Sequence, residues 1–184
     1  GDFFYKYFLS IYNYGTPEVT SVLVSAQGSN LSEAKIDLHR KIDKKFLETE
    51  KVYILSENYV RNYGIKDLVD DTFKDPITND MAMVMICKDN PKDYLLYEIK
   101  GYPSSADFLE GLLDSSIYEN FFCNNFKLID LFVRLDAEGR SIVLPYIEFD
   151  QNGIYKSGVS LFKEDKMVCK LDIEETKWMN ILRE

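Results

Sequence analysis

Residues Tyr155–Arg183 read YKSGVSLFKEDKMVCKLDIEETKWMNILR, a self-contained pattern of strand, turn, strand and helix. Apolar residues dominate Ser157–Phe162 and Lys166–Leu171, whereas the charged residues 163–165 between them are too hydrophilic for a core. Two apolar runs that meet at a polar turn are typical of paired strands. The stretch therefore predicts a β-hairpin.

A helix is predicted to follow this hairpin. Asp172 stands at an N-cap position, where its carboxylate accepts a backbone N–H, and Glu175 completes the spacing of a capping box. Glu174 and Glu175 also place negative charge in the first turn, where the helix dipole favours it. Further along, apolar residues recur at helical spacing, so we expect one face to be buried against the hairpin; these residues are Trp178, Ile181 and Leu182.

The order of residues in this unit resembles the Ger(x)C family, the C subunits of bacterial spore germinant receptors. That family shows a Gly-small-apolar-apolar-Phe-Lys strand, then Asp-Lys-apolar-Val, then Leu-Asp and Glu-Glu-Thr. The corresponding residues here are Gly158–Lys163, Asp165–Val168, Leu171-Asp172 and Glu174–Thr176. The family usually continues after Val with Gly-Trp, whereas this chain has Cys169-Lys170, so the contact made by that Trp must be formed differently.

Two sets of residues are candidates for a functional site. The first set carries the resemblance and either holds the hairpin to the helix or faces a partner; it consists of Gly158, Phe162, Lys163, Val168, Leu171, Asp172, Glu175 and Thr176. The second set contains aromatic residues that would anchor a partner if they are exposed, because aromatic side chains are enriched at protein interfaces; it consists of Tyr5, Tyr7, Tyr12, Tyr14, Phe121 and Phe122.

The remaining sequence predicts alternating strands and helices. Strands are expected at Phe3–Tyr12, Val19–Ala26, Val52–Leu55, Met81–Cys87 and Ser141–Phe149. Helices are expected at 31–46, from 57 to 64, and at 65–73, 104–113 and 126–135, and residues 94–99 fit either state. Met81–Cys87 is apolar throughout and should be central in a sheet. Pro145 argues for an edge strand or a bulge.

These elements predict an α+β fold: a mixed β-sheet of about five strands flanked by helices, followed by a small β-hairpin plus helix unit. The polar residues 150–153 form the best boundary between the two parts. We therefore expect an N-terminal α+β domain at residues 1–150 and a small hairpin-helix second domain at residues 151–184. A chain of 184 residues is long enough for this arrangement.

Composition argues against several classes of function. The net charge of −9 would repel a phosphate backbone, so nucleic acid is not an expected partner. The three cysteines lack CxxC spacing and are expected to be buried free thiols, and His39 is the single histidine. Asp75, Asn79 and Asp80 lack the spacing of an EF-hand loop. We expect no catalytic, cofactor-binding or metal-binding residues, and no enzyme activity.

The resemblance extends from Phe4 to Arg183, including Val143–Ile147, which matches a Val-Leu-Pro-Tyr-like strand of the family. Family members also carry a signal peptide with a lipid-modified Cys and a further C-terminal domain. The start of this chain is not a signal peptide, and its longest apolar run, Met81–Cys87, is far short of the roughly 20 residues of a membrane span. The chain is therefore interpreted as a soluble fragment of a lipoprotein.

The resemblance implies a non-catalytic extracytoplasmic subunit that acts in receptor assembly and germination signalling. Its implied partners are the A and B membrane subunits of the germinant receptor. Its implied location is the outer face of the spore inner membrane, where the full-length protein is tethered by lipid. The alternative is an extracytoplasmic module that itself binds a small nutrient, which would require a pocket with convergent polar groups. An enzyme is the third possibility.

Overall fold

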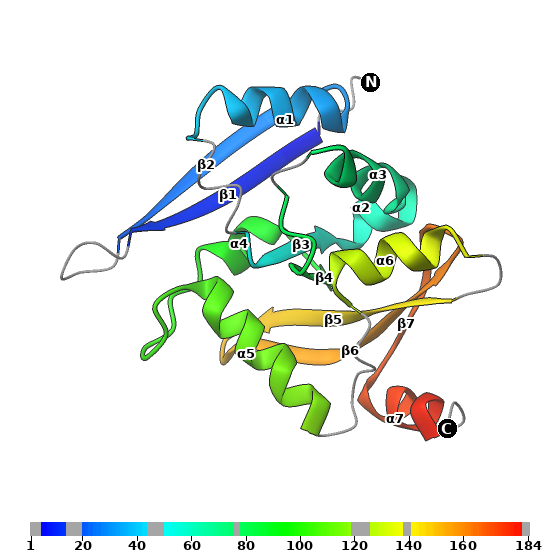
Figure 1. The fold of residues 1–184 in the computed structure, drawn as a ribbon. Helices are drawn as coiled ribbons and strands as arrows, with labels where there is room; N and C mark the ends of the chain where they lie inside the picture. Colours follow the sequence, from blue (N-terminus) through cyan, green and yellow to red (C-terminus); the bar gives the residue numbers. More distant parts are fainter. Residues whose placement is uncertain are drawn as a thin grey trace.

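The computed structural model describes residues 5–13, 20–43, 50–75, 78–118, 126–137 and 141–181, and its strands form two separate sheets (Figure 1). The smaller sheet pairs β1 (Tyr5–Asn13) with β2 (Thr20–Gly28) in antiparallel fashion. The larger sheet has the strand order β3-β4-β5-β6-β7. Its strands are β3 (Val52–Ser56), β4 (Met83–Cys87), β5 (Ile142–Asp150), β6 (Gly153–Lys163) and β7 (Lys166–Leu171).

The larger sheet is mixed, because β3, β4 and β5 run parallel while β5, β6 and β7 run antiparallel. The predicted α+β class with a five-stranded mixed sheet is confirmed. The structure also shows which strands take part. The first two predicted strands form their own sheet, and the predicted hairpin supplies β6 and β7 to the larger one.

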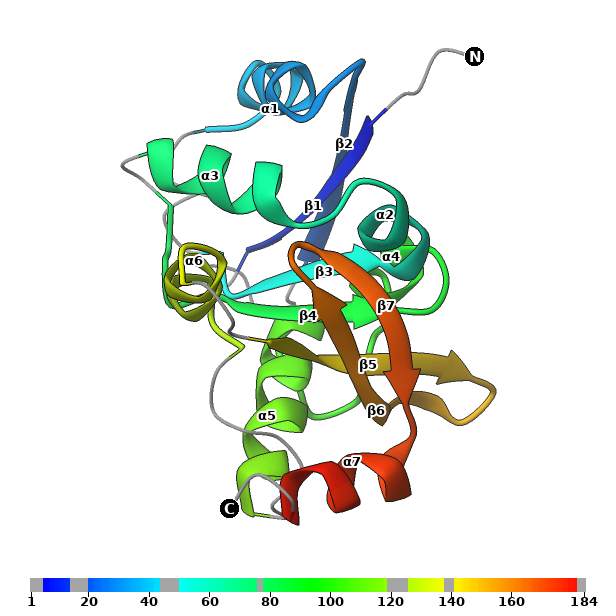
Figure 2. The same cartoon turned by 90° about the vertical axis from the view of Figure 1, so that its right-hand side faces the viewer.

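Seven helices accompany the strands in the described part of the chain. Figures 1 and 2 show α1 beside the β1–β2 hairpin at one end of the molecule and α7 at the other end. The first predicted helix ends earlier than expected, at His39, and residues 44–49 lie outside the described ranges. The helices are α1 (Leu31–His39), α2 (Glu57–Asn62), α3 (Lys66–Lys74), α4 (Pro91–Leu95), α5 (Ser105–Tyr118), α6 (Leu128–Leu135) and α7 (Ile173–Ile181).

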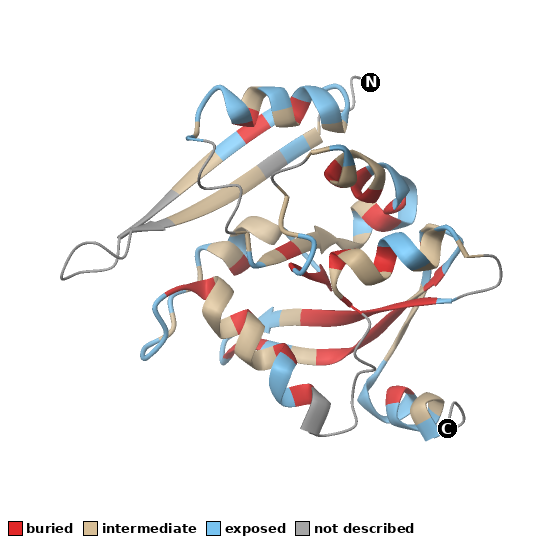
Figure 3. Ribbon diagram, in the orientation of Figure 1, coloured by how far each residue is buried: buried red, intermediate tan, exposed pale blue. Residues whose placement is uncertain are grey.

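The main hydrophobic core lies on the larger sheet. All five residues of β4 are buried, as predicted for a central strand, and Figure 3 shows the buried residues concentrated on β4, β5 and β6. The small sheet has a separate apolar cluster in which Ala26 and Leu38 are buried. Among the described side chains this second cluster is much smaller than the first, so the apolar burial described there stabilises the small sheet much less.

Pro145 lies in β5, the middle strand of the five, so the edge-strand expectation is wrong and the bulge expectation is right. The register of β5 against β6 shifts between Tyr146 and Ile147, next to this proline. Strand β5 pairs with β4 only from Tyr146 onward. The missing N–H of Pro145 therefore lies just before the parallel pairing begins, where no ladder bond is lost.

The sheet continues across the boundary expected at residue 150. Strands β5 and β6 pair from Ile142–Phe162 to Asp150–Gly153 around a tight turn. Residues 151–181 thus complete the larger sheet. Their separate role as a second domain stays a prediction.

Candidate functional site

Gly158, the first residue of the resembling motif, is fixed by close backbone packing. It is buried in β6 with a φ of +146°, and a Cβ atom at this position would lie 1.8 Å from the carbonyl oxygen of Leu171. Only glycine adopts this conformation without strain. The contact between Gly158 and Leu171 is therefore a structural reason for the motif.

The capping box that opens α7 is present as predicted. The backbone N–H of Glu175 donates to Asp172 Oδ1 at 2.9 Å, and the N–H of Asp172 donates to Glu175 Oε2 at 2.9 Å. Thr176 is fully buried, and its hydroxyl donates to the carbonyl oxygen of Asp172. The two bonds between Asp172 and Glu175 satisfy backbone N–H groups that the helix end would otherwise leave unpaired, and the Thr176 bond satisfies a buried hydroxyl.

The other motif residues divide between core and surface. Phe162 is buried in the main core and the half-buried Leu171 packs against it, whereas Lys163 and Val168 are exposed. The expectation that Trp178 and Ile181 bury one helix face is wrong, because these side chains are 68% and 61% exposed. Leu182 lies outside the described residues.

A different face of α7 meets the core. Thr176 is buried, and Met179 packs against the main cluster. These two residues are three positions apart and share a helix face, which leaves Trp178 and Ile181 turned toward solvent. The apolar spacing found in the sequence therefore marks an outward face.

Helix α2 lies beside β7 (Figure 2), and three hydrogen bonds tie α2 and the start of α3 to the β6–β7 hairpin. The backbone N–H of Ile65 donates to the carbonyl oxygen of Asp165 at 2.9 Å. Lys166 Nζ donates to the carbonyl oxygen of Asn62 at 2.9 Å, and Arg61 Nη1 to that of Val168 at 3.0 Å. The turn of the hairpin is thus held against the α2–α3 junction.

Lys170, where the sequence departs from the family pattern, lies in a half-buried cluster of charged and aromatic groups. Its Nζ atom lies 4.6 Å from the ring centroid of Tyr146 and 2.8 Å from Glu148 Oε2. Lys88 Nζ lies 3.2 Å from the other oxygen of Glu148. A cation over the face of an aromatic ring is attracted to it, so Lys170 makes a ring contact of its own here.

Two carboxylates in this cluster are held ionised. Burial opposes the charge of Glu148, but hydrogen bonds from Lys170 and Lys88 outweigh it and lower the pKa of this carboxyl. Burial likewise opposes the charge of Glu57, and hydrogen bonds from Tyr146 and Arg61 hold its pKa below the ordinary value. Burial and the bond to Glu57 raise the pKa of Tyr146. Groups in these states hold structure together and are not poised to exchange protons near neutral pH.

A cleft of about 1210 Å³ lies where strand β1 of the small sheet approaches strand β3 of the larger one. Val52–Ser56 form one wall, and residues of β1 between Tyr5 and Ile11 form the facing wall. Asn58 and residues 88–90, which follow β4, supply polar groups. This cleft could not be predicted from sequence patterns, because its walls come from segments about 40 residues apart.

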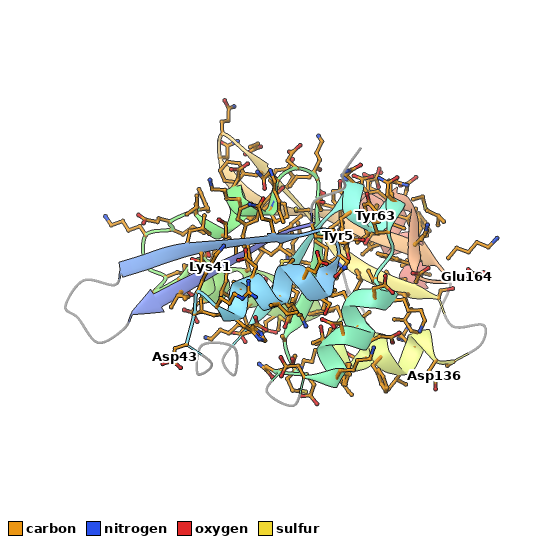
Figure 4. The ribbon with its side chains drawn as sticks, turned by 90° about the horizontal axis from the view of Figure 1, so that it is seen from above. Tyr5, Lys41, Asp43, Tyr63, Asp136 and Glu164 are labelled. Atoms are coloured by element: carbon orange, nitrogen blue, oxygen red, sulfur yellow. The ribbon has the colours of Figure 1, made fainter. Side chains whose placement is uncertain are left out.

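One end of the cleft carries a cluster of three tyrosine rings. Tyr5 lies 5.9 Å from Tyr59 and 5.4 Å from Tyr63, measured between ring centroids, and Figure 4 shows Tyr5 and Tyr63 together at the same end of the hairpin. Burial raises the pKa of Tyr5 and of Tyr59, and Asp67 adds to both shifts. Tyr5 therefore packs against other rings and is not a freely projecting anchor.

The remaining aromatic candidates are placed only in part. Tyr7 and Tyr12 belong to β1, but their side chains are not described. Tyr14, Phe121 and Phe122 lie outside the described residues. The role of all these tyrosines and phenylalanines at an interface stays a prediction.

The described residues also bear on metal binding, on the cysteines and on membrane spans. No group of three or more His, Cys, Asp or Glu side chains among them could hold a metal ion. Cys87 is a buried free thiol as expected, and burial raises its pKa to about 12, whereas Cys169 is only half-buried. Cys123 lies outside the described ranges. None of the described helices combines the length and hydrophobicity required to cross a bilayer.

Comparison with known proteins places the chain in a family. The family model for the spore germination protein N-terminal domain matches residues 5–149. The crystal structure of the GerBC protein is similar, with a TM-score of 0.53 and 16% identity, over 95% of this chain and 54% of GerBC. The likeness to GerBC concerns the fold, and the chain spans about half the length of that protein. No curated protein matches the sequence. The chain therefore belongs to the family of the spore germination protein N-terminal domain, which confirms the resemblance to Ger(x)C germinant receptor C subunits.

Proposed function

We propose that this chain is a non-catalytic, extracytoplasmic part of a spore nutrient-germinant receptor and acts in receptor assembly and germination signalling. Its partners are the A and B membrane subunits, and lipid tethers the full-length protein to the outer face of the spore inner membrane. Membership in the family supports a place in such a receptor. Assembly requires a surface that another subunit can cover.

The observation that carries the assembly role is an exposed apolar surface on α7, formed by Ile173, Trp178 and Ile181 and called here the α7 face. Trp178 is the single tryptophan of the chain, and it is 68% exposed. Tryptophan in an exposed apolar patch is the residue type most often found at the centre of a protein interface. The α7 face therefore fits contact with another subunit.

The test is capture of the A and B subunits, in detergent, by the full-length lipidated protein. We expect Trp178→Ala combined with Ile181→Ala to lower capture about tenfold or more, since removal of a central tryptophan costs about 2 kcal/mol or more. The matched control is Met81→Ala combined with Leu96→Ala, which removes apolar side chains of similar exposure from other surfaces. Equal capture by the α7 variant and the parent would contradict the role of the α7 face.

A second candidate function is direct binding of a small nutrient. The cleft between β1 and β3 favours it, because it combines apolar walls with polar groups from Asn58 and Asn90. Isothermal titration of the soluble domain with single L-amino acids and monosaccharides tests this function. Saturable binding that is weakened by Asn58→Ala would support nutrient binding. Heats of injection no larger than the heat of dilution would exclude nutrient binding for those ligands.

A further inference from the structure

The walls of the cleft are strand edges. Every residue from Val52 to Ser56 in β3 lines the cleft, and so do the neighbours Tyr5-Lys6 and Phe8–Ile11 in β1. Successive side chains of a strand point to opposite faces, so a wall made by one face would contain only alternate residues. Consecutive lining residues mean that the cleft borders the backbone of each strand. Both strands end their sheets on this side.

The edge of β3 directs unpaired backbone groups into the cleft. Met83 N–H donates to the carbonyl oxygen of Lys51 at 2.9 Å, so Lys51 and then Tyr53 and Leu55 turn their backbone groups toward β4. The intervening residues Val52 and Ile54 therefore turn their N–H and C=O groups toward the cleft. No hydrogen bond joins those groups to any other residue in the described part of the chain. An edge of this kind is a template for another strand.

The cleft is large for a small nutrient. Sites for drug-sized ligands occupy about 300–1,000 Å³, and the cleft has about 1210 Å³. A single amino acid or monosaccharide would leave most of this space to water. A bound peptide of several residues in extended conformation would fill the cleft and reach both walls.

Charge on the cleft walls differs from that of the whole chain. Lys6, Lys51 and Lys88 line the cleft against Glu50 and Asp89, whereas acidic residues outnumber basic residues in the sequence, 31 to 22. Lys51 pairs with Asp107, and Lys88 lies 3.2 Å from Glu148. Lys6 forms no ion pair with any residue that the structure describes. Among the described residues, the wall formed by β1 therefore offers a cation without a counter-charge.

We propose that the cleft binds an extended peptide segment of a partner polypeptide, which pairs with the free edge of β3 as an added strand. The segment carries alternate apolar side chains for the cleft walls and a carboxylate within reach of Lys6. Its backbone bonds to the N–H and C=O groups of Val52 and Ile54, as in other complexes formed by strand addition. This inference rests on the proposed role in assembly and adds a second contact surface, distinct from the α7 face.

The first test selects octapeptides from a random displayed library on the soluble domain and measures the affinity of synthetic copies. Ile54→Pro removes the N–H that faces the cleft and leaves the N–H groups that bond to β4 in place, so we expect it to weaken binding about tenfold, the effect of one lost hydrogen bond in a closed site. Ile54→Val keeps that N–H and should bind like the parent. Lys6→Glu should weaken the binding of acidic peptides about threefold. Failure to enrich any peptide, or equal binding by the Ile54→Pro variant, would overturn the proposal.

The second test needs no variant. Amide hydrogen exchange of the parent domain should slow at least tenfold at Val52 and Ile54 when the selected peptide is bound. Tyr53 and Leu55 already bond to β4 and should change little. Uniform protection along β3, or protection by L-amino acids alone, would refute strand addition, and the latter would favour the nutrient-binding function. Loss of subunit capture in the α7 variant does not depend on peptide affinity or on amide exchange in β3. The role of the α7 face and strand addition in the cleft can therefore be refuted independently of each other.

Discussion

The chain contains two hairpin-helix units that are alike locally and differ in their surroundings. The first comprises β1, β2 and α1, and the second comprises β6, β7 and α7. Each helix begins with an N-cap side chain that accepts the backbone N–H of a Glu three residues later, and the carboxylate of that Glu accepts a backbone N–H in return. In the first unit Glu33 N–H donates to Asn30 Oδ1 and Ser29 N–H to Glu33 Oε2, both at 2.9 Å. In the second, Asp172 and Glu175 bond directly to each other as a reciprocal capping box.

The two units pack differently. The first forms a sheet of its own over the small cluster of Ala26 and Leu38, and leaves the edge of β1 open. The second extends the larger sheet and contributes four side chains to the main core: Ile154, Val159, Phe162 and Met167. The same local pattern of hairpin and helix therefore forms a separate small sheet in one case and part of the main sheet in the other. The difference depends on whether a free strand edge and a large apolar surface lie within reach.

The largest expected effect comes from deletion of each unit in turn. A chain of residues 50–184 should keep a cooperative urea transition, because it retains the whole larger sheet. A chain of residues 1–150 should lose it. Its β5 has no antiparallel partner, and each of the four missing core side chains contributes about 1.5–3 kcal/mol, a sum comparable to the whole stability of a domain. Circular dichroism during urea titration decides between these outcomes. A cooperative transition of residues 1–150 would instead support two separate domains.

Gly158→Ala is expected to have the next largest effect. The added methyl group meets the backbone of Leu171 in a conformation unsuited to alanine, which costs about 3 kcal/mol in the free energy of unfolding. The matched control is Gly101→Ala, where φ is +96° and nothing lies within 4 Å of the new Cβ. That substitution should cost about 1 kcal/mol. Equal losses for both glycines, measured by urea unfolding, would show that the Leu171 contact is unimportant.

Loss of the N-cap residue should affect the stability of the two units differently. Asp172→Ala should lower the global free energy of unfolding by about 1 kcal/mol, because α7 packs on the main core through Thr176 and Met179. Asn30→Ala should leave the global value nearly unchanged and accelerate amide exchange in α1 alone. Similar global losses in both variants would mean that the first unit unfolds together with the larger sheet.

The smallest expected effect is a pH dependence that arises where Lys170 of the second unit bonds to Glu148 of β5. The pKa of Glu148 is lowered below its ordinary value of 4.5 by Lys170 and Lys88. Its contribution to stability is therefore complete above that value and is lost as the pH falls through the lower pKa of the folded state. Glu148→Gln should make the loss of stability in acid shallower, as seen in urea midpoints between pH 5 and pH 3. An unchanged pH profile would show that the ion pairs are neutral for stability.

Local features of the site were largely predictable. Asp172 and Glu175 lie where the capping pattern placed them, and Met83–Cys87 is buried as its apolar run indicated. Trp178 and Ile181 were misplaced, because helical spacing shows which residues share a face but not which face meets the core. The positions of Tyr59 and Ile54 opposite β1 could not be predicted, since no sequence pattern links them to that strand.

The sequence by itself determined the strands, most of the helices, the α+β class and the family, because all of these depend on residues close together in the chain or on their order. The tertiary structure alone decided which strands share a sheet, which face of α7 is exposed, and that a cleft opens between the edges of β1 and β3. These features depend on competition between distant apolar surfaces for one core. The hydrophobic effect does not depend on which segments of the chain supply the apolar surfaces, so a local sequence pattern cannot show which surfaces pack together.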